Sequence, residues 1–161
     1  MILIFMKKLL LVLTIVMMAI PSLAQDGSFT RCQGFFVRPS LYGGAFVDAG
    51  YQFNPYIQAS VGGGVSLIVR NFSQITIDPA YVAHGGIRVY TSKNRWAGMI
   101  DYHAGYSNLL GNDYLRQTLV GGASFDNLDF GGGLYLMNNT NGGYAYGFLV
   151  TVGWNFRFCK H

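Results

Sequence analysis

The side chains that could do chemistry in this sequence are few, and most of them are arginine, aspartate or histidine. They are Arg38, Asp48, His84, Arg88, Asp101, His103, Arg116, Asp129 and Arg157. Arginine and aspartate in comparable numbers can neutralise one another or line a narrow ion path. The two histidines could ligate a metal, but no cysteine or carboxylate cluster stands at ligand spacing from them. No serine, histidine and acid form a nucleophilic arrangement, so we expect no enzyme activity, no cofactor and no metal.

These residues lie in segments whose apolar and polar positions alternate. In the final stretch, 144–158, the even positions are apolar or aromatic, whereas the odd positions are small or polar apart from Leu149. Alternation over this length predicts a β-strand with two different faces. Eight such segments span 35–43, 45–53, 56–69, 80–91, 96–108, 114–126, 128–137 and 144–158. The first two could instead form one strand over 35–47, and Pro39 suits a weakly paired position or a bulge.

The connections between the segments differ at the two ends of the expected sheet. Tight turns are expected at 54–55, 92–95 and 126–127, and a longer connection over 70–79. An even number of antiparallel strands with short turns at one end is typical of an outer-membrane barrel. Because open strand edges are costly in hydrocarbon, the first strand must then pair with the eighth. We therefore expect an all-β chain whose residues 25–161 form a closed, eight-stranded antiparallel up-and-down barrel.

The composition and the first residues agree with such a barrel. Residues 1–24 are expected to be a cleaved signal peptide, because Lys7 and Lys8 precede an apolar run and small residues reach Ala24. The apolar run, 9–20, is shorter than the roughly 20 residues that a spanning helix needs. The chain has no glutamate and is 51% hydrophobic and 11% charged, so it lacks an ordinary water-facing surface. A formal net charge of +4 is too small to indicate nucleic-acid binding.

The charged side chains indicate which face of the barrel points inward. Arginine and aspartate in balance suit an enclosed lumen, where each charge needs a partner. Aromatic residues gather near both ends of the apolar face, as they do at the two interfaces of a bilayer. Eight strands leave an interior that side chains can fill, so a salt-bridged plug is favoured over a narrow ion or solute channel. A soluble lipocalin-like barrel, with its apolar face around a ligand, is the other alternative.

The last segment carries the most specific motif: polar, any, Gly, any, any, apolar, any, aromatic. Its defining residues are Thr151, Gly153, Phe156 and Phe158. With this motif and the eight segments, the chain resembles the small OmpA/OmpX-type outer-membrane β-barrel proteins. The resemblance implies a bacterial outer-membrane location, lipid as a partner, recognition of the motif by the barrel-assembly machinery, and a structural or interaction role. The family's strand ends on its aromatic residue, whereas three residues follow Phe158 here. The ligand and the oligomeric state stay open.

Two cysteines flank the expected barrel. Cys32 precedes the first segment and Cys159 follows the last. Closure makes these segments antiparallel neighbours, so both cysteines fall at the same end, in an oxidising compartment. We therefore expect a Cys32–Cys159 disulfide across the seam, with two free thiols as the alternative.

Overall fold

The computed structural model describes residues 31–71, 76–139 and 142–159, with the backbone alone at 67–71 and 76–78. The expected signal peptide, 1–24, lies outside these residues. The described chain forms strands only. They are β1 (Gly34–Tyr42), β2 (Gly44–Asn54), β3 (Ile57–Asn71), β4 (Thr76–Tyr90), β5 (Trp96–Leu109), β6 (Asn112–Phe125), β7 (Leu128–Asn139), β8 (Tyr144–Trp154) and β9 (Phe156–Cys159).

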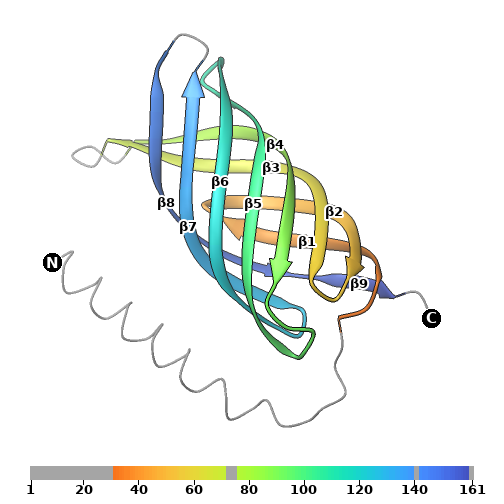
Figure 1. Ribbon diagram of the computed structural model, residues 1–161. Coiled ribbons are helices and arrows are strands. Elements are labelled where there is room, and N and C mark those ends of the chain that lie inside the picture. Colours follow the sequence, from red (N-terminus) through yellow and green to blue (C-terminus); the bar gives the residue numbers. More distant parts are fainter. Residues whose placement is uncertain (1–30, 72–75, 140–141, 160–161) are drawn as a thin grey trace, which may run out of the picture.

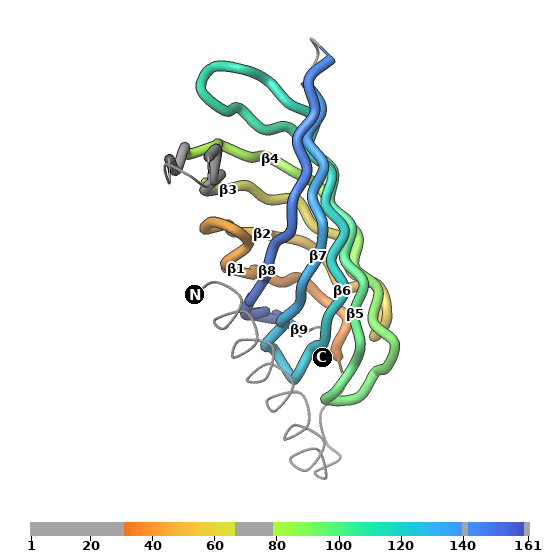
Figure 2. Tube along the Cα trace, turned by 90° about the vertical axis from the view of Figure 1, so that its left-hand side faces the viewer, coloured from red at the N-terminus to blue at the C-terminus, as the bar shows by residue number. Residues whose placement is uncertain are grey.

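The strands close into a barrel (Figures 1 and 2). Each strand from β1 to β7 pairs antiparallel with the next, and β1 pairs with both β8 and β9. β8 and β9 are two parts of one strand that is interrupted at Asn155. The predicted closed, eight-stranded antiparallel up-and-down barrel is therefore confirmed.

The seam between the first and last strands is interrupted opposite a proline. Ser40 pairs with Gly153 and Val37 pairs with Phe156, so the register is the same on both sides of the gap. Arg38 and Pro39, between them, have no partner on this side. Proline has no N–H to donate and cannot complete a ladder there. The weakly paired position predicted at Pro39 is thus confirmed, and it coincides with the break at Asn155.

The two faces of the sheet have opposite polarity. Large apolar side chains project outward; Val61 is 69% and Phe148 88% exposed. Charged residues of the strands such as Asp48 and Arg88 project inward, where they are 2% and 4% exposed. The expected orientation is confirmed, with one addition that sequence reasoning missed. The lumen also holds an apolar cluster of Tyr42, Phe46, Val82, Tyr90, Ala97, Met99, Val120 and Leu149, with Tyr135 packed against it.

Two expectations about connections are settled by the strand boundaries. The first two segments form a hairpin with Gly43 at its tip, in the left-handed region at φ 58°, so the single strand over 35–47 is wrong. The long connection over 70–79 is also wrong. Pairing continues to Val69 with Ile77 and to Asn71 with Thr76, because the polar residues there still follow the alternation of a strand. The connections among the described strands are therefore short at both ends.

A disulfide joins the segments that flank the first and last strands, at one end of the barrel. Cys32 and Cys159 are bonded with their Cα atoms 5.5 Å apart, although 127 positions separate them in sequence. Cys159 stands opposite Gly34 on the β1–β9 ladder, so the bond lies directly beside the last backbone pair of the seam. The predicted disulfide is confirmed.

The disulfide yields a stability prediction. Replacing both cysteines, Cys32→Ser with Cys159→Ser, should lower the free energy of unfolding by roughly 4–5 kcal/mol, because the bond closes a loop of more than a hundred residues. Denaturant unfolding of the refolded chain measures this. Reductant should destabilise the parent by the same amount and leave the double variant unchanged. Complete thiol labelling of the folded parent without reductant would contradict the prediction.

Candidate functional site

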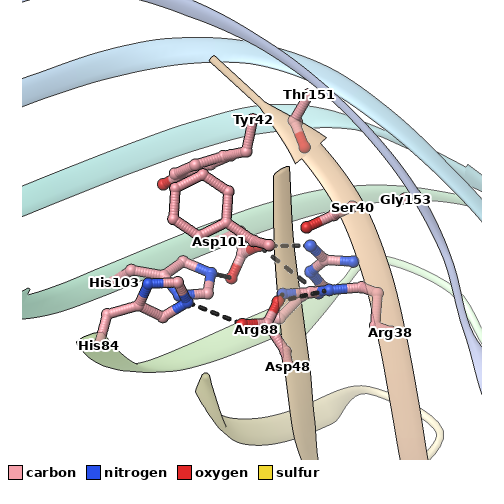
Figure 3. A pocket seen from close by; sticks show the side chains of 11 residues that line it. Arg38, Ser40, Tyr42, Asp48, His84, Arg88, Asp101, His103, Thr151 and Gly153 are labelled. Carbon is pink, nitrogen blue, oxygen red and sulfur yellow. Dashed lines mark hydrogen bonds and ion pairs between the residues drawn. The ribbon is translucent and has the colours of Figure 1, made fainter. Parts of the chain in front are cut away.

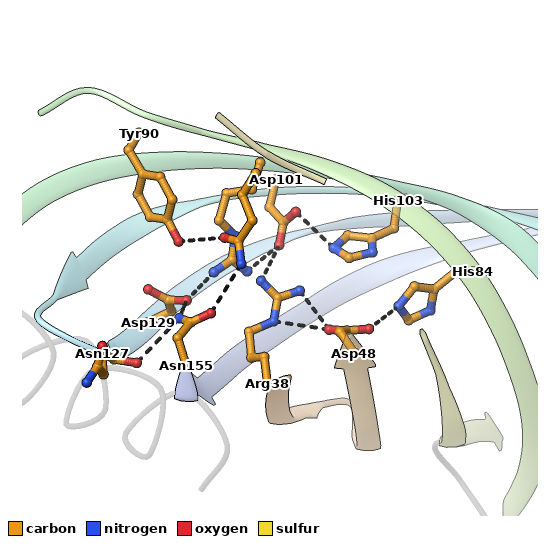
Figure 4. A network of polar contacts seen from close by, with 11 residues as sticks. Arg38, Asp48, His84, Tyr90, Asp101, His103, Asn127, Asp129 and Asn155 are labelled. Carbon is orange, nitrogen blue, oxygen red and sulfur yellow. Dashed lines mark hydrogen bonds and ion pairs between the residues drawn. The ribbon is translucent and has the colours of Figure 1, made fainter. Parts of the chain in front are cut away.

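The centre of the lumen is a buried network of ion pairs (Figure 4). Arg38 on β1 and Asp48 on β2 face each other in the ladder, and Arg38 Nη2 and Nε lie 2.7 and 3.1 Å from Asp48 Oδ2. Arg38 Nη1 also lies 3.7 Å from Asp101 Oδ2 on β5, across the lumen. One guanidinium therefore links strands on opposite walls of the barrel.

Arg88 on β4 makes the second crossing. Its Nη2 donates to Asp101, the neighbour opposite it on β5, and its Nη1 donates to Asp129 on β7. Together with Arg38, it connects three carboxylates into one chain, so that each charge in this chain has a partner of opposite sign. Burial of these groups is tolerated only because they are paired.

Two histidines extend the network toward the β1–β2 tip (Figure 3). His84 Nε2 lies 2.7 Å from Asp48 Oδ1, and His103 Nε2 lies 2.9 Å from Asp101 Oδ1. Their rings meet edge to face with centroids 4.6 Å apart. Within the described residues, no group of three histidine, cysteine, aspartate or glutamate side chains is placed to hold a metal ion. The arrangement is one of hydrogen bonds that orient each carboxylate.

The other end of the network uses neutral residues that sequence reasoning missed. Asn155, in the break between β8 and β9, donates to Asp129 and lies 3.4 Å from Gln58 Nε2. Tyr90 Oη donates to Gln58 Oε1 at 2.9 Å. All three side chains occupy inward positions of the alternation, which is the one signal that could have singled them out. The interruption of the last strand thus places the Asn155 amide against Asp129, at one end of the ion-pair network.

Two of the nine predicted network residues lie elsewhere. Arg157 Nη1 donates to the Asp126 carbonyl at 3.0 Å and to Asn127 Oδ1 at 2.5 Å, at the turn between β6 and β7. Arg116 on β6 lies among aromatic rings, with its Cζ 5.4–5.8 Å from the ring centroids of Tyr135, Tyr42 and Phe46. The structure therefore brings seven of the predicted residues into one network and separates these two from it.

Arg31 closes the short-turn end of the barrel. Its Nη1 donates to the carbonyls of Ser92 and Asn94 at 2.9 and 2.5 Å, and its guanidinium lies 4.4 Å from the Tyr90 ring centroid. Burial lowers the pKa of the Arg31 guanidinium, and Tyr90 opposes that shift. This role was not predicted, because Arg31 precedes the first alternating segment.

Glycines create the room that this network needs. A Cβ on Gly62 would lie 2.0 Å from Asp48 Oδ1, and one on Gly86 would lie 2.6 Å from His103 Nδ1. With the side chains in place, the cavity beside the network measures about 10 Å³ (Figure 3). That volume is about one probe sphere, enough for a single water molecule. The network thus fills the lumen at this level.

The four residues of the terminal motif divide between the two faces. Thr151 and Gly153 point into the lumen and are buried, whereas Phe156 and Phe158 project outward and are exposed. Gly153 lies beside the Arg38 side chain, since a Cβ there would be 3.4 Å from Arg38 Cδ. The motif therefore has a packing role in the lumen as well as an exposed aromatic edge.

Comparison of the chain with protein-family models, with curated proteins and with solved structures found no match. Among the described residues, no helix is long and apolar enough to cross a membrane, a finding that concerns helices only.

The network yields a second stability prediction. Arg88→Met should lower the free energy of unfolding by about 3–5 kcal/mol, because it leaves two buried carboxylates without their shared cation. The matched control is Arg95→Met, which removes a pair with Asp126 whose side chains are 33% and 26% exposed. That change should cost at most about 1 kcal/mol. Denaturant unfolding measures both, and equal losses would show that the lumen network does not dominate stability.

Proposed function

We propose that this protein is an integral outer-membrane β-barrel with a structural or interaction role, a filled lumen and no catalysis. The observation that carries the proposal is the inverted polarity of the sheet, with large apolar side chains outside and ion pairs inside. An apolar surface that runs around the whole barrel would be strongly unfavourable in water, whereas acyl chains would solvate it.

Aromatic side chains at both ends of the outer face support a membrane position. The pairing places Trp96, Phe125, Leu128 and Trp154 next to one another on four successive strands at the short-turn end. At the other end, Tyr81, Tyr106, Tyr144 and Tyr146 are 49–75% exposed. Belts of aromatic residues flank the apolar band of outer-membrane barrels at the two lipid interfaces.

The same observations weigh against the two alternatives. A soluble lipocalin-like barrel would enclose its ligand in an apolar cavity and present charge to water. Here the charges are enclosed, and the network leaves a cavity of about 10 Å³. A narrow channel would need a continuous path through the lumen, which Arg38, Arg88 and the apolar cluster fill.

The terminal motif fits assembly into the membrane. Phe156 and Phe158 are exposed on the short last strand, where insertion machinery could read them, as the resemblance to OmpA/OmpX-type barrels implies. Cys159 follows Phe158 and is tied to Cys32, so this strand end is covalently anchored after folding. Recognition would then have to precede the disulfide.

Fractionation and gel mobility test the proposal. The protein should be recovered with outer membranes and should migrate faster unboiled than boiled, because a closed barrel resists cold detergent. The boiled and unboiled samples should be compared without reductant, with the disulfide intact in both. Recovery in the soluble fraction would overturn the proposal.

Depth-dependent substitution provides a quantitative prediction. Val61 and Ile57 lie on the outer face of β3, and Ile57 is close to the short-turn end. In phospholipid bilayers, Val61→Arg should cost about 2–4 kcal/mol and Ile57→Arg about 0–1 kcal/mol. Denaturant unfolding from vesicles measures both. Changes within about 0.5 kcal/mol at both sites would instead fit a water-exposed surface.

A further inference from the structure

One side of the barrel wall is incomplete at the end opposite the disulfide. β8 pairs with β7 from Tyr144 onward, but its pairing with β1 begins only at Thr151. Figures 1 and 2 both show β7 and β8 continuing past the tip of the β1–β2 hairpin. Along 144–150, the outer edge of β8 therefore has no strand partner among the described residues. We call this unpaired edge the notch.

Aromatic side chains lie immediately inside the notch. Tyr135 stands opposite Gly147, and a Cβ on Gly147 would lie 2.8 Å from Tyr135 Cε1 and Oη, so the ring covers the edge strand. Tyr42 and Phe46, from the hairpin that ends below the notch, meet edge to face with centroids 5.4 Å apart. Tyr42 and Phe46 belong to the apolar cluster of the lumen, and Tyr135 packs against that cluster.

Among these three rings lies a buried cation without an anion. Arg116 is 5% exposed, and its Nε and Nη1 have no hydrogen-bond partner among the described residues. The centroids of the three aromatic rings lie 5.4–5.8 Å from its Cζ, and Nε and Nη1 remain without an acceptor. A buried, unpaired guanidinium is unfavourable, and a carboxylate or phosphate is the group that it binds best.

An apolar groove adjoins the same residues on the outer face. It has a volume of about 330 Å³, and its lining includes Leu119, Leu134, Leu136 and Phe148. Tyr135 and Gly147 also line it, so the groove and the Arg116 site share the edge of β8. A volume of this size is in the lower range of small-molecule sites.

We propose that the barrel binds an anionic amphiphile, with its carboxylate or phosphate head on Arg116 and its acyl tail in this groove. The head crosses the notch, where no neighbouring strand blocks it, and supplies the charge that Arg116 lacks. The tail lies against leucine and phenylalanine side chains. The inference rests on the proposed membrane location for its supply of ligand, because such amphiphiles partition into bilayers.

Titration of the folded barrel in phosphatidylcholine nanodiscs tests the site. The probes are dodecanoate and dodecyl phosphate, with acetate and inorganic phosphate as heads without tails. Both long-chain probes should bind saturably and shift the Arg116 Nε–H resonance, and the tailless anions should not at equal concentration. Arg116→Gln should weaken binding roughly tenfold to a hundredfold, as expected for loss of charged hydrogen bonds. The matched control, Arg95→Gln, alters an arginine at the opposite end and should bind like the parent.

Each of the following results would overturn the proposal. Equal binding by Arg116→Gln and the parent would mean that the amphiphile only partitions into the bilayer, and equal binding of acetate would mean a site for free anions. If Arg116→Gln does not fold, a chain-length series on the parent replaces it, and affinity that fails to rise from hexanoate to dodecanoate is again contradictory. A parent that fractionates with membranes but binds no probe refutes this site and leaves the membrane location standing.

Discussion

Confinement is the constraint on which this structure depends: an eight-stranded barrel is so narrow that side chains from opposite walls meet. Arg38 reaches from β1 to Asp101 on β5, and Arg88 reaches from β4 to Asp129 on β7. The charged side chains of this network therefore need both partners of opposite charge and small neighbours. Gly62 and Gly86 fill the second requirement beside Asp48 and His103. These two glycines make room for charges that the lumen encloses.

Much of the architecture could be predicted because a strand repeats every two residues and a barrel must close. These two rules were enough for the strand count and the meeting of Cys32 with Cys159. The inward face followed from the balance of arginine and aspartate, and the weak pairing at Pro39 from the N–H that proline lacks. The connection over 70–79 was predicted wrongly, because polar residue types suggest a loop even where backbone pairing continues through Asn71 and Thr76. Residue type alone does not show where a ladder ends.

Most residues of the candidate site could be predicted from the sequence, but the contacts between them could not. Alternation assigns a residue to the lumen, but it gives neither its height nor its partner across the barrel. For that reason Arg116 was grouped with the acids although it lies among Tyr42, Phe46 and Tyr135. Asn155 was overlooked because its role depends on an interruption of the strand that the pattern of 144–158 does not reveal. The position of a side chain along the barrel axis and its contact across the lumen both follow from the stagger between strands. This stagger is a property of the closed sheet.

The position of the disulfide has a consequence for the order of events during biogenesis. Cys32 and Cys159 come from opposite ends of the folded sequence and approach only when β1 lies against β9 in this register. A chain that is still an open sheet, or that is closed with shifted strands, holds the two thiols apart. The disulfide therefore forms only after the barrel has closed in the correct register. Once formed, the bond prevents the interrupted seam from peeling open at its end.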